Sequence, residues 1–208
     1  PHTDYNAYLS PMLVPGVMFL FIFIFTAYSI GCELKYERSH EWLKMAGGNI
    51  WVALMGKMLP QMLLSMLMMS AYLIYIYGVM GFPHEGSWMV IFLLGFLSVL
   101  AAEGFGIFMF SLLPSMRMSM SLCSLWAVLS FSMVGTAFPV MAMDPALETL
   151  AWLFPLRHYF VIYQTSIFSG YSLTYCWVNI VCLIAFALLP LPLMGRLKKA
   201  MMTFKYMD

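Results

Sequence analysis

Residues 88–110 read WMVIFLLGFLSVLAAEGFGIFMF, an apolar run that carries one charged residue, Glu103. A helix rises about 1.5 Å per residue and the hydrocarbon core of a bilayer is about 30 Å thick, so about 20 apolar residues can cross a membrane. Four other runs are also long enough, at residues 11–31, 58–78, 119–140 and 175–194. We therefore expect an all-α, polytopic membrane protein whose residues 1–208 form a single transmembrane domain with five transmembrane helices.

The overall composition agrees with a membrane protein. Hydrophobic residues make up 63% of the 208 residues and charged residues only 9%, whereas soluble domains have about 45–50% apolar and about 25% charged residues. The net charge is +1, so the chain has no basic excess with which to neutralise a nucleic-acid backbone. We exclude a soluble protein and a nucleic-acid-binding protein.

Lysine and arginine are distributed unevenly among the segments that connect the apolar runs. Nine of the ten lie in residues 32–57, 111–118 and 195–208, and only Arg157 lies in the alternate segments. Lysine and arginine collect on the cytoplasmic side of membrane proteins. We therefore expect the N-terminal end of this sequence to lie outside the cell and the C-terminus in the cytoplasm.

The chain shows no motif for metal, nucleotide or catalytic chemistry. Its four cysteines form no Cys-x-x-Cys pair, and its four histidines form no zinc-binding spacing. Gly56-Lys57 is followed by Met58 rather than Ser or Thr, and no glycine precedes it at phosphate-loop spacing. We expect no catalytic residue, no metal and no cofactor on this chain, so any ATP is bound elsewhere.

Residues 32–49 are rich in charge and lie on the predicted cytoplasmic side. Glu33, Glu37 and Glu41 recur every four residues, which would place three carboxylates on one stripe of a helix over residues 33–46. Gly47-Gly48 is a suitable helix stop. We expect this helix to lie along the membrane surface, where a basic partner would relieve the repulsion between the carboxylates. The alternative is a solvated face without a partner.

Residues 138–170, which contain the expected re-entrant segment 141–170, are too apolar for an exposed loop, yet prolines divide them into pieces too short to span a bilayer. Pro139, Pro145 and Pro155 mark the divisions. We expect two short re-entrant helices that dip into the outer leaflet and cap the bundle, with Arg157 and Tyr159 in the second of them.

The order of these features resembles a known family. An acidic and basic stretch leads to Gly56-Lys57 and Pro60, and Phe138-Pro139, then Pro155-Leu156-Arg157-His158-Tyr159, then Gly170 precede the last apolar run. This ordered set resembles the permease subunit of type-2 ATP-binding-cassette (ABC-2) transporters, and it is similar to the drug-efflux branch. One departure is Ser39-His40, where the family often has Gly-Thr.

The resemblance implies an exporter in the bacterial cytoplasmic (inner) membrane that works as a homo- or heterodimer of permease protomers. It implies separate ABC ATPase subunits that bind ATP and Mg and dock on residues 33–46. It also implies a substrate pathway between protomers, lined by the first and fourth spans, and an upstream span with an extracytoplasmic domain outside the given residues. The residues expected to couple to the ATPase are Glu33, Glu37, Arg38, Glu41, Trp42 and Leu43, with Trp42 and Leu43 as apolar anchors.

Two alternatives of other classes remain at this point. An ion-coupled secondary transporter or channel could use Glu103 as its carboxylate switch, and a scaffold protein would transport nothing. A carboxylate inside a span should face the bundle interior. Lys57 or Arg117 could pair with Glu103, or Glu103 could occupy a polar contact or a wet cavity.

Overall fold

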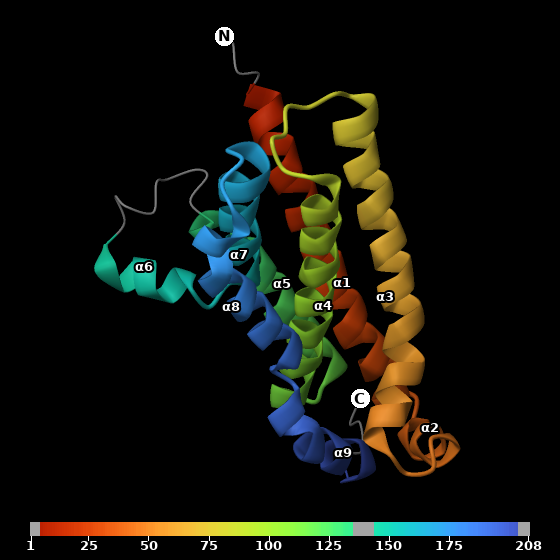
Figure 1. Cartoon of the computed structure of the whole chain (residues 1–208). Coiled ribbons are helices and arrows are strands. Elements are labelled where there is room, and N and C mark those ends of the chain that lie inside the picture. Colours follow the sequence, from red (N-terminus) through yellow and green to blue (C-terminus); the bar gives the residue numbers. More distant parts are fainter. Residues whose placement is uncertain (1–4, 135–143, 204–208) are drawn as a thin grey trace.

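The computed structural model describes residues 5–134 and 144–203, and every regular element in these residues is helical, as the sequence predicts (Figure 1). The α-helices are α1 (Tyr5–Lys35), α2 (Ser39–Met45), α3 (Ile50–Ile74), α4 (Trp88–Leu112), α5 (Met116–Met133), α6 (Pro145–Ala151), α7 (Pro155–Ile162), α8 (Trp177–Leu188) and α9 (Met194–Thr203). Single π-helical turns extend α3 over Tyr75–Val79 and α7 over Tyr163–Phe168, and short 3₁₀ turns precede α8 and α9 at Leu173–Cys176 and Leu191–Leu193.

The described residues contain four helical stretches long and apolar enough to cross a membrane. They are Leu9–Lys35, Ile50–Val79, Trp88–Leu112 and Leu173–Thr203. The predicted count of five is not confirmed, because α5, which covers most of the predicted run at 119–140, has 18 residues that include Arg117 and five serines. A membrane crossing by α5 stays a prediction.

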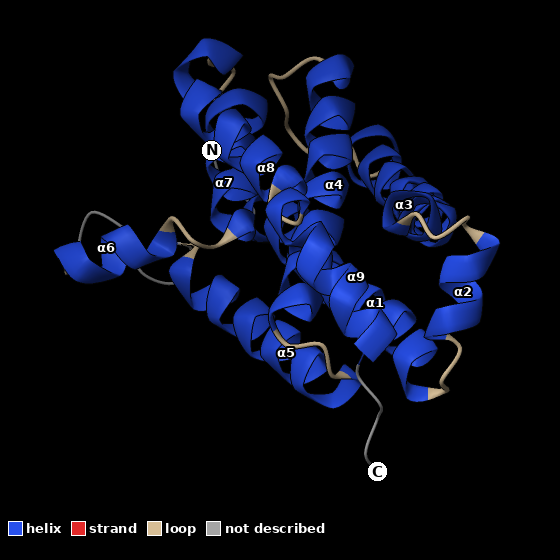
Figure 2. Cartoon of the chain, turned by 90° about the horizontal axis from the view of Figure 1, so that it is seen from below, coloured by secondary structure: helices blue, strands red, loops and turns tan. Residues whose placement is uncertain are grey.

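Helix α4 lies at the centre of the bundle and is the most buried of the four candidate spans. Figure 2 shows it between α3 and α8, with α1 and α5 beyond it. Two glycines of α4 allow this helix to approach α8 and α1 closely. A Cβ at Gly104 would lie 2.5 Å from the carbonyl oxygen of Ala187 on α8, and one at Gly106 would lie 2.8 Å from Cβ of Thr26 on α1. Small residues at helix contacts are the usual means by which transmembrane helices approach each other.

Helix α1 contains Pro11 and Pro15 near its N-terminal end. Because Pro15 has no N–H, the carbonyl of Pro11 lacks its helical donor. The hydroxyl of Tyr159 on α7 donates to this carbonyl at 3.0 Å. The tyrosine that the sequence marked in the outer segment therefore attaches α7 to α1.

Helices α6 and α7 occupy the segment for which the sequence predicts two short re-entrant helices. Each begins with a proline, Pro145 and Pro155, at a position that needs no backbone donor. Pro139 lies outside the described residues. Re-entry of α6 and α7 into the outer leaflet stays a prediction.

Candidate functional site

The segment predicted as one helix over residues 33–46 is divided in the structure. Helix α1 continues to Lys35, and Glu37 has a φ of +56°, in the left-handed region. The N–H of Arg38 donates to the carbonyl of Glu33 at 2.9 Å and that of Glu37 to Leu34 at 3.3 Å. This is a Schellman motif with Glu37 at the position that glycine usually occupies.

The predicted stripe of three carboxylates is therefore wrong. Glu33 lies on α1, Glu37 in the turn and Glu41 on α2. The predicted stop at Gly47-Gly48 is confirmed. Both glycines have positive φ, and the N–H of Gly48 donates to the carbonyl of Leu43 at 2.8 Å, which ends α2.

Helix α2 is held against the bundle by the chain's own second hydrophobic core. Leu43 is 2% exposed in this core. The core also contains residues from α1, α3, α4 and α9, namely Ile30, Leu34, Ile50, Leu54, Met58, Phe110, Met194, Leu197 and Met201. Leu43 was expected to anchor a partner; its side chain instead fixes α2 to four other helices. Figure 1 shows α2 and α9 at the same end of the molecule.

Three elements meet beside this core through polar and aromatic contacts. Lys57 on α3 forms an ion pair with Glu33 on the last turn of α1. Its ammonium lies 5.6 Å from the ring centroid of Trp42 on α2, within the range of a cation–π interaction. Lys57 therefore links the C-terminal end of α1, the short helix α2 and the N-terminal part of α3.

Glu103 does not pair with Lys57, which corrects the pairing considered from the sequence. Glu103 is 5% exposed, and among the described residues its Oε1 has no hydrogen-bond partner. Lys57 has the carboxylate of Glu33 instead. The structure thus places the two intramembrane polar candidates in different surroundings.

The outward face of α2 remains exposed. His40, Glu41, Lys44 and Met45 are exposed on it, as are Tyr36, Glu37 and Arg38 of the preceding turn. Met45 is 81% exposed. This face combines both signs of charge with a large apolar side chain, so it could dock a protein partner.

A second polar cluster lies where α7 packs against α8. Arg157 is largely buried, and its guanidinium lies 5.6 Å from the ring centroid of Trp152. His158 Nε2 lies 2.9 Å from the carbonyl oxygen of Trp152, and its Nδ1 lies 2.9 Å from Oδ1 of Asn179 on α8. The sequence reasoning did not single out Trp152 or Asn179, whose role in joining α7 to α8 depends on the tertiary fold.

The sequence reasoning also missed a polar pair between α1 and α3. Gln61 Nε2 donates to Oγ1 of Thr26 at 2.7 Å, and both side chains are buried. The available signal was a polar residue inside each of two apolar runs. Over the described ranges, no group of three or more His, Cys, Asp or Glu residues could hold a metal ion.

Comparison with known proteins identifies the family. The model of the ABC-2 family transporter proteins matches residues 1–195. The probable multidrug ABC transporter permease YbhR of Escherichia coli, strains K12 and O157:H7, is 22% identical over 179 residues, which cover 85% of this chain and 48% of the relative. The chain thus spans about half the length of these curated relatives, and no solved structure matches it significantly. With a family match that covers nearly all of its residues and four helices able to cross a membrane, the chain belongs to the ABC-2 family of transporter proteins.

Proposed function

We propose that this chain forms the membrane-spanning permease part of an ATP-driven exporter of small molecules, acting as a dimer in the bacterial cytoplasmic membrane. The family match supports this proposal, as does the similarity to the E. coli relatives, which are described as a probable multidrug ABC transporter permease. ATP and Mg bind to separate ATPase subunits, and ATP hydrolysis takes place there. The end that carries α2 and α9 faces the cytoplasm, in agreement with the distribution of Lys and Arg.

The buried attachment of α2 is the observation that carries the coupling role. Leu43 and the second core join α2 to α1, α3, α4 and α9. Since packed cores transmit displacement rather than absorb it, an ATPase that moves α2 also moves the ends of these four helices. The exposed face with Glu41 and Met45 is the docking surface in this proposal.

The contacts of Lys57 give this movement a second route. A shift of α2 displaces the ring of Trp42 from the ammonium of Lys57, and Lys57 in turn holds Glu33 at the end of α1. Both partners of the ion pair are partly exposed, with 20% of each side chain accessible. Such a pair contributes little stability, so it can break and reform as α1 and α3 move.

The proposal is tested by purifying the complete protein through a tag and measuring the ATPase subunit that is recovered with it. Met45→Ala should reduce ATPase recovery about 5-fold or more, as truncation of an interface anchor does. The matched control is Met89→Ala, because Met89 is also 81% exposed but lies in the first turn of α4. Helix α4 begins at the end of the molecule away from α2 (Figure 1). The control should recover ATPase normally.

Further variants make the same test independent of the Met45 side chain. Glu41→Lys should lower ATPase recovery and ATP-dependent export together, whereas Glu85→Lys, at an exposed position of the opposite end, should change neither. Trp42→Ala should lower export through the lost contact with Lys57. Normal ATPase recovery with both Met45→Ala and Glu41→Lys, at normal membrane abundance, would contradict docking on α2.

A second candidate function rests on Glu103. A buried carboxylate with an oxygen that has no hydrogen-bond partner among the described residues is costly in a membrane, and such a group can serve ion-coupled transport. In that case transport does not depend on ATP, and Glu103→Gln abolishes it. In the ABC exporter that we favour, transport survives the substitution.

A further inference from the structure

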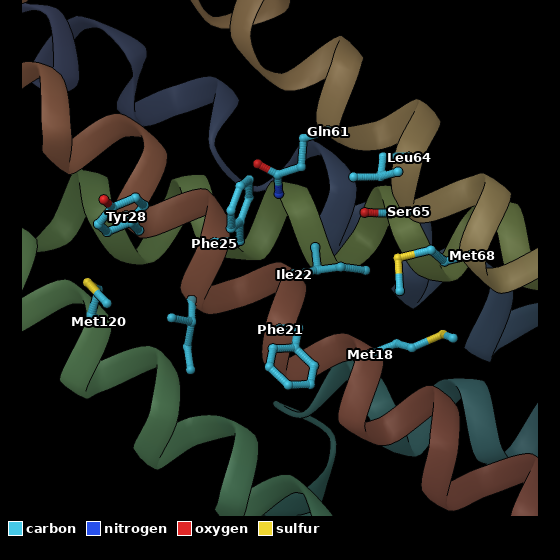
Figure 3. Close-up of a pocket in the computed structure, with 11 residues that line it drawn as sticks. Met18, Phe21, Ile22, Phe25, Tyr28, Gln61, Leu64, Ser65, Met68 and Met120 are labelled. Carbon is cyan, nitrogen blue, oxygen red and sulfur yellow. The ribbon is translucent and has the colours of Figure 1, made fainter.

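A groove of about 340 Å³ runs along α1 and is bordered by α3 and α5 (Figure 3). Phe21, Phe25 and Tyr28 of α1 form one part of its wall, and Leu64 and Met68 of α3 form another. None of the described residues that line it is charged. Its volume lies within the range of pockets that bind small molecules, about 300–1,000 Å³.

One polar side chain in the wall has an unmet hydrogen-bonding capacity. Gln61 is 8% exposed, and its Nε2 donates to Thr26 Oγ1 at 2.7 Å, which orients the carboxamide. Among the described residues Gln61 Oε1 has no donor. A buried acceptor without a donor is unfavourable, so a donor supplied by a ligand would gain more here than at an ordinary polar site.

Access to this oxygen requires one side chain to move. Gln61 Oε1 has no exposed surface, and Figure 3 shows the ring of Phe25 beside the carboxamide in the groove. Phe25 is 54% exposed. Exposed side chains change rotamer within picoseconds to nanoseconds, so an incoming molecule can take the place of the ring.

We propose that this groove binds a mainly apolar small molecule that carries a hydrogen-bond donor, and that Gln61 Oε1 accepts this donor. The proposal rests on the export function proposed above and names its substrate class. The thioethers of Met18, Met68 and Met120 supply adaptable apolar contacts that suit molecules of different shape. A lipid acyl chain fits the apolar wall equally well but has no donor, so it leaves Gln61 Oε1 unpaired.

Two matched dyes separate the hydrogen bond from apolar contact. Rhodamine 6G carries two secondary aryl amine N–H groups and two ring methyl groups. Tetramethylrhodamine ethyl ester has the same xanthene ring system and ethyl ester, but it lacks the ring methyl groups and its amines are fully alkylated. The complete protein in lipid nanodiscs is titrated with each dye and binding is followed by fluorescence anisotropy. The wild type should prefer rhodamine 6G by about 3- to 10-fold, the effect of one hydrogen bond.

Two variants identify Gln61 as the source of this preference. Gln61→Met keeps the size of the side chain but removes the acceptor oxygen. The ratio of the two affinities should therefore fall to about 1, the value expected for apolar contact alone. Thr26→Val breaks the same internal hydrogen bond but leaves the Gln61 oxygen in place, so the preference for rhodamine 6G should persist. Leu64→Trp, which fills the groove, should weaken both dyes equally.

Several results would overturn the proposal. They are an unchanged preference in Gln61→Met, an equal loss of preference in Thr26→Val, and failure of the wild type to bind either dye. A fourth is a disulfide between two copies carrying Phe21→Cys that excess dye does not prevent, because a second protomer would then occupy the groove. ATPase recovery is measured on the same samples, so normal recovery without dye binding overturns this site and leaves the proposed function standing.

Discussion

The hydrogen bond from Tyr159 to the carbonyl of Pro11 provides a quantitative test of how α7 is attached to α1. The two groups are 3.0 Å apart, and Tyr159 is 2% exposed. Pro15, four residues after Pro11, cannot donate to that carbonyl. In Tyr159→Phe the carbonyl therefore loses its donor in a buried site.

The size of the effect follows from that burial. An unsatisfied buried acceptor costs about 1–3 kcal/mol, while side-chain hydrogen bonds between transmembrane helices average about 0.6 and reach about 1.7 kcal/mol. We expect Tyr159→Phe to lower the free energy of unfolding by about 1.5 kcal/mol, near the upper end of the membrane values, because no backbone N–H can replace the hydroxyl. Pro15→Ala restores such an N–H. In the Pro15→Ala background the cost of Tyr159→Phe should fall below about 0.5 kcal/mol.

The assay is a double-mutant cycle on the purified protein in mixed micelles, unfolded by increasing the fraction of sodium dodecyl sulfate and followed by tryptophan fluorescence. Tyr72→Phe is the control. The hydroxyl of Tyr72 donates at 2.7 Å to the carbonyl of Ser10, but Val14 retains the N–H that serves that carbonyl in a helix. Its removal should cost less than that of Tyr159. If the costs of Tyr159→Phe and Pro15→Ala add to within about 0.3 kcal/mol, the two are independent and the reasoning is refuted.

Three further predictions concern packing, orientation and Glu103. Gly104→Ala should destabilise the protein by about 1–3 kcal/mol because its Cβ would meet the backbone of α8, whereas Gly56→Ala, which meets nothing within 4 Å, should stabilise it by about 0.5–1 kcal/mol in the same unfolding assay. A cysteine introduced at Ser172 should react with a membrane-impermeant thiol reagent in sealed cells and one at Lys199 should not; labelling at Lys199 would reverse the orientation. Glu103→Gln should retain ATP-dependent export, and a complete loss of export would favour the ion-coupled alternative.

Much of the fold could be predicted because the decisive signals are local. An apolar run of about 20 residues specifies a helix in a membrane, where the backbone must satisfy its own hydrogen bonds. Gly47-Gly48 and Pro155 mark a helix end and a helix start through backbone geometry alone. The helix break at Glu37 could not be found in this way, since a glutamate in the left-handed region gives no sequence signal of a turn.

The position of α2 is easier to predict from the sequence than the side of the helix that faces inward. Seven residues form α2, and such a short helix has too few turns for periodicity to separate a buried face from a docking face. Both Trp42 and Leu43 were natural candidates for a partner contact. The structure assigns Leu43 to the internal core, so the apolar part of the exposed face is Met45.

The partner of Lys57 shows why charge pairing depends on depth in the membrane. Lys57 lies about 10 Å along α3 from its first residue, Ile50, and Glu33 lies on the last turn of α1 at the same end of the bundle. Glu103 lies about 14 Å inside α4 from the end of that helix at Leu112. A pair between Lys57 and Glu103 would have required an ammonium to move deeper into an apolar interior, whereas the pair with Glu33 keeps both charges partly exposed.

The continuation of α1 beyond the predicted end at residue 31 makes the pair between Lys57 and Glu33 possible, because it carries Glu33 to the level of Lys57. The same extension brings α1 into contact with α2, so one helical turn determines both the ion pair and the surface on which the proposed ATPase partner acts.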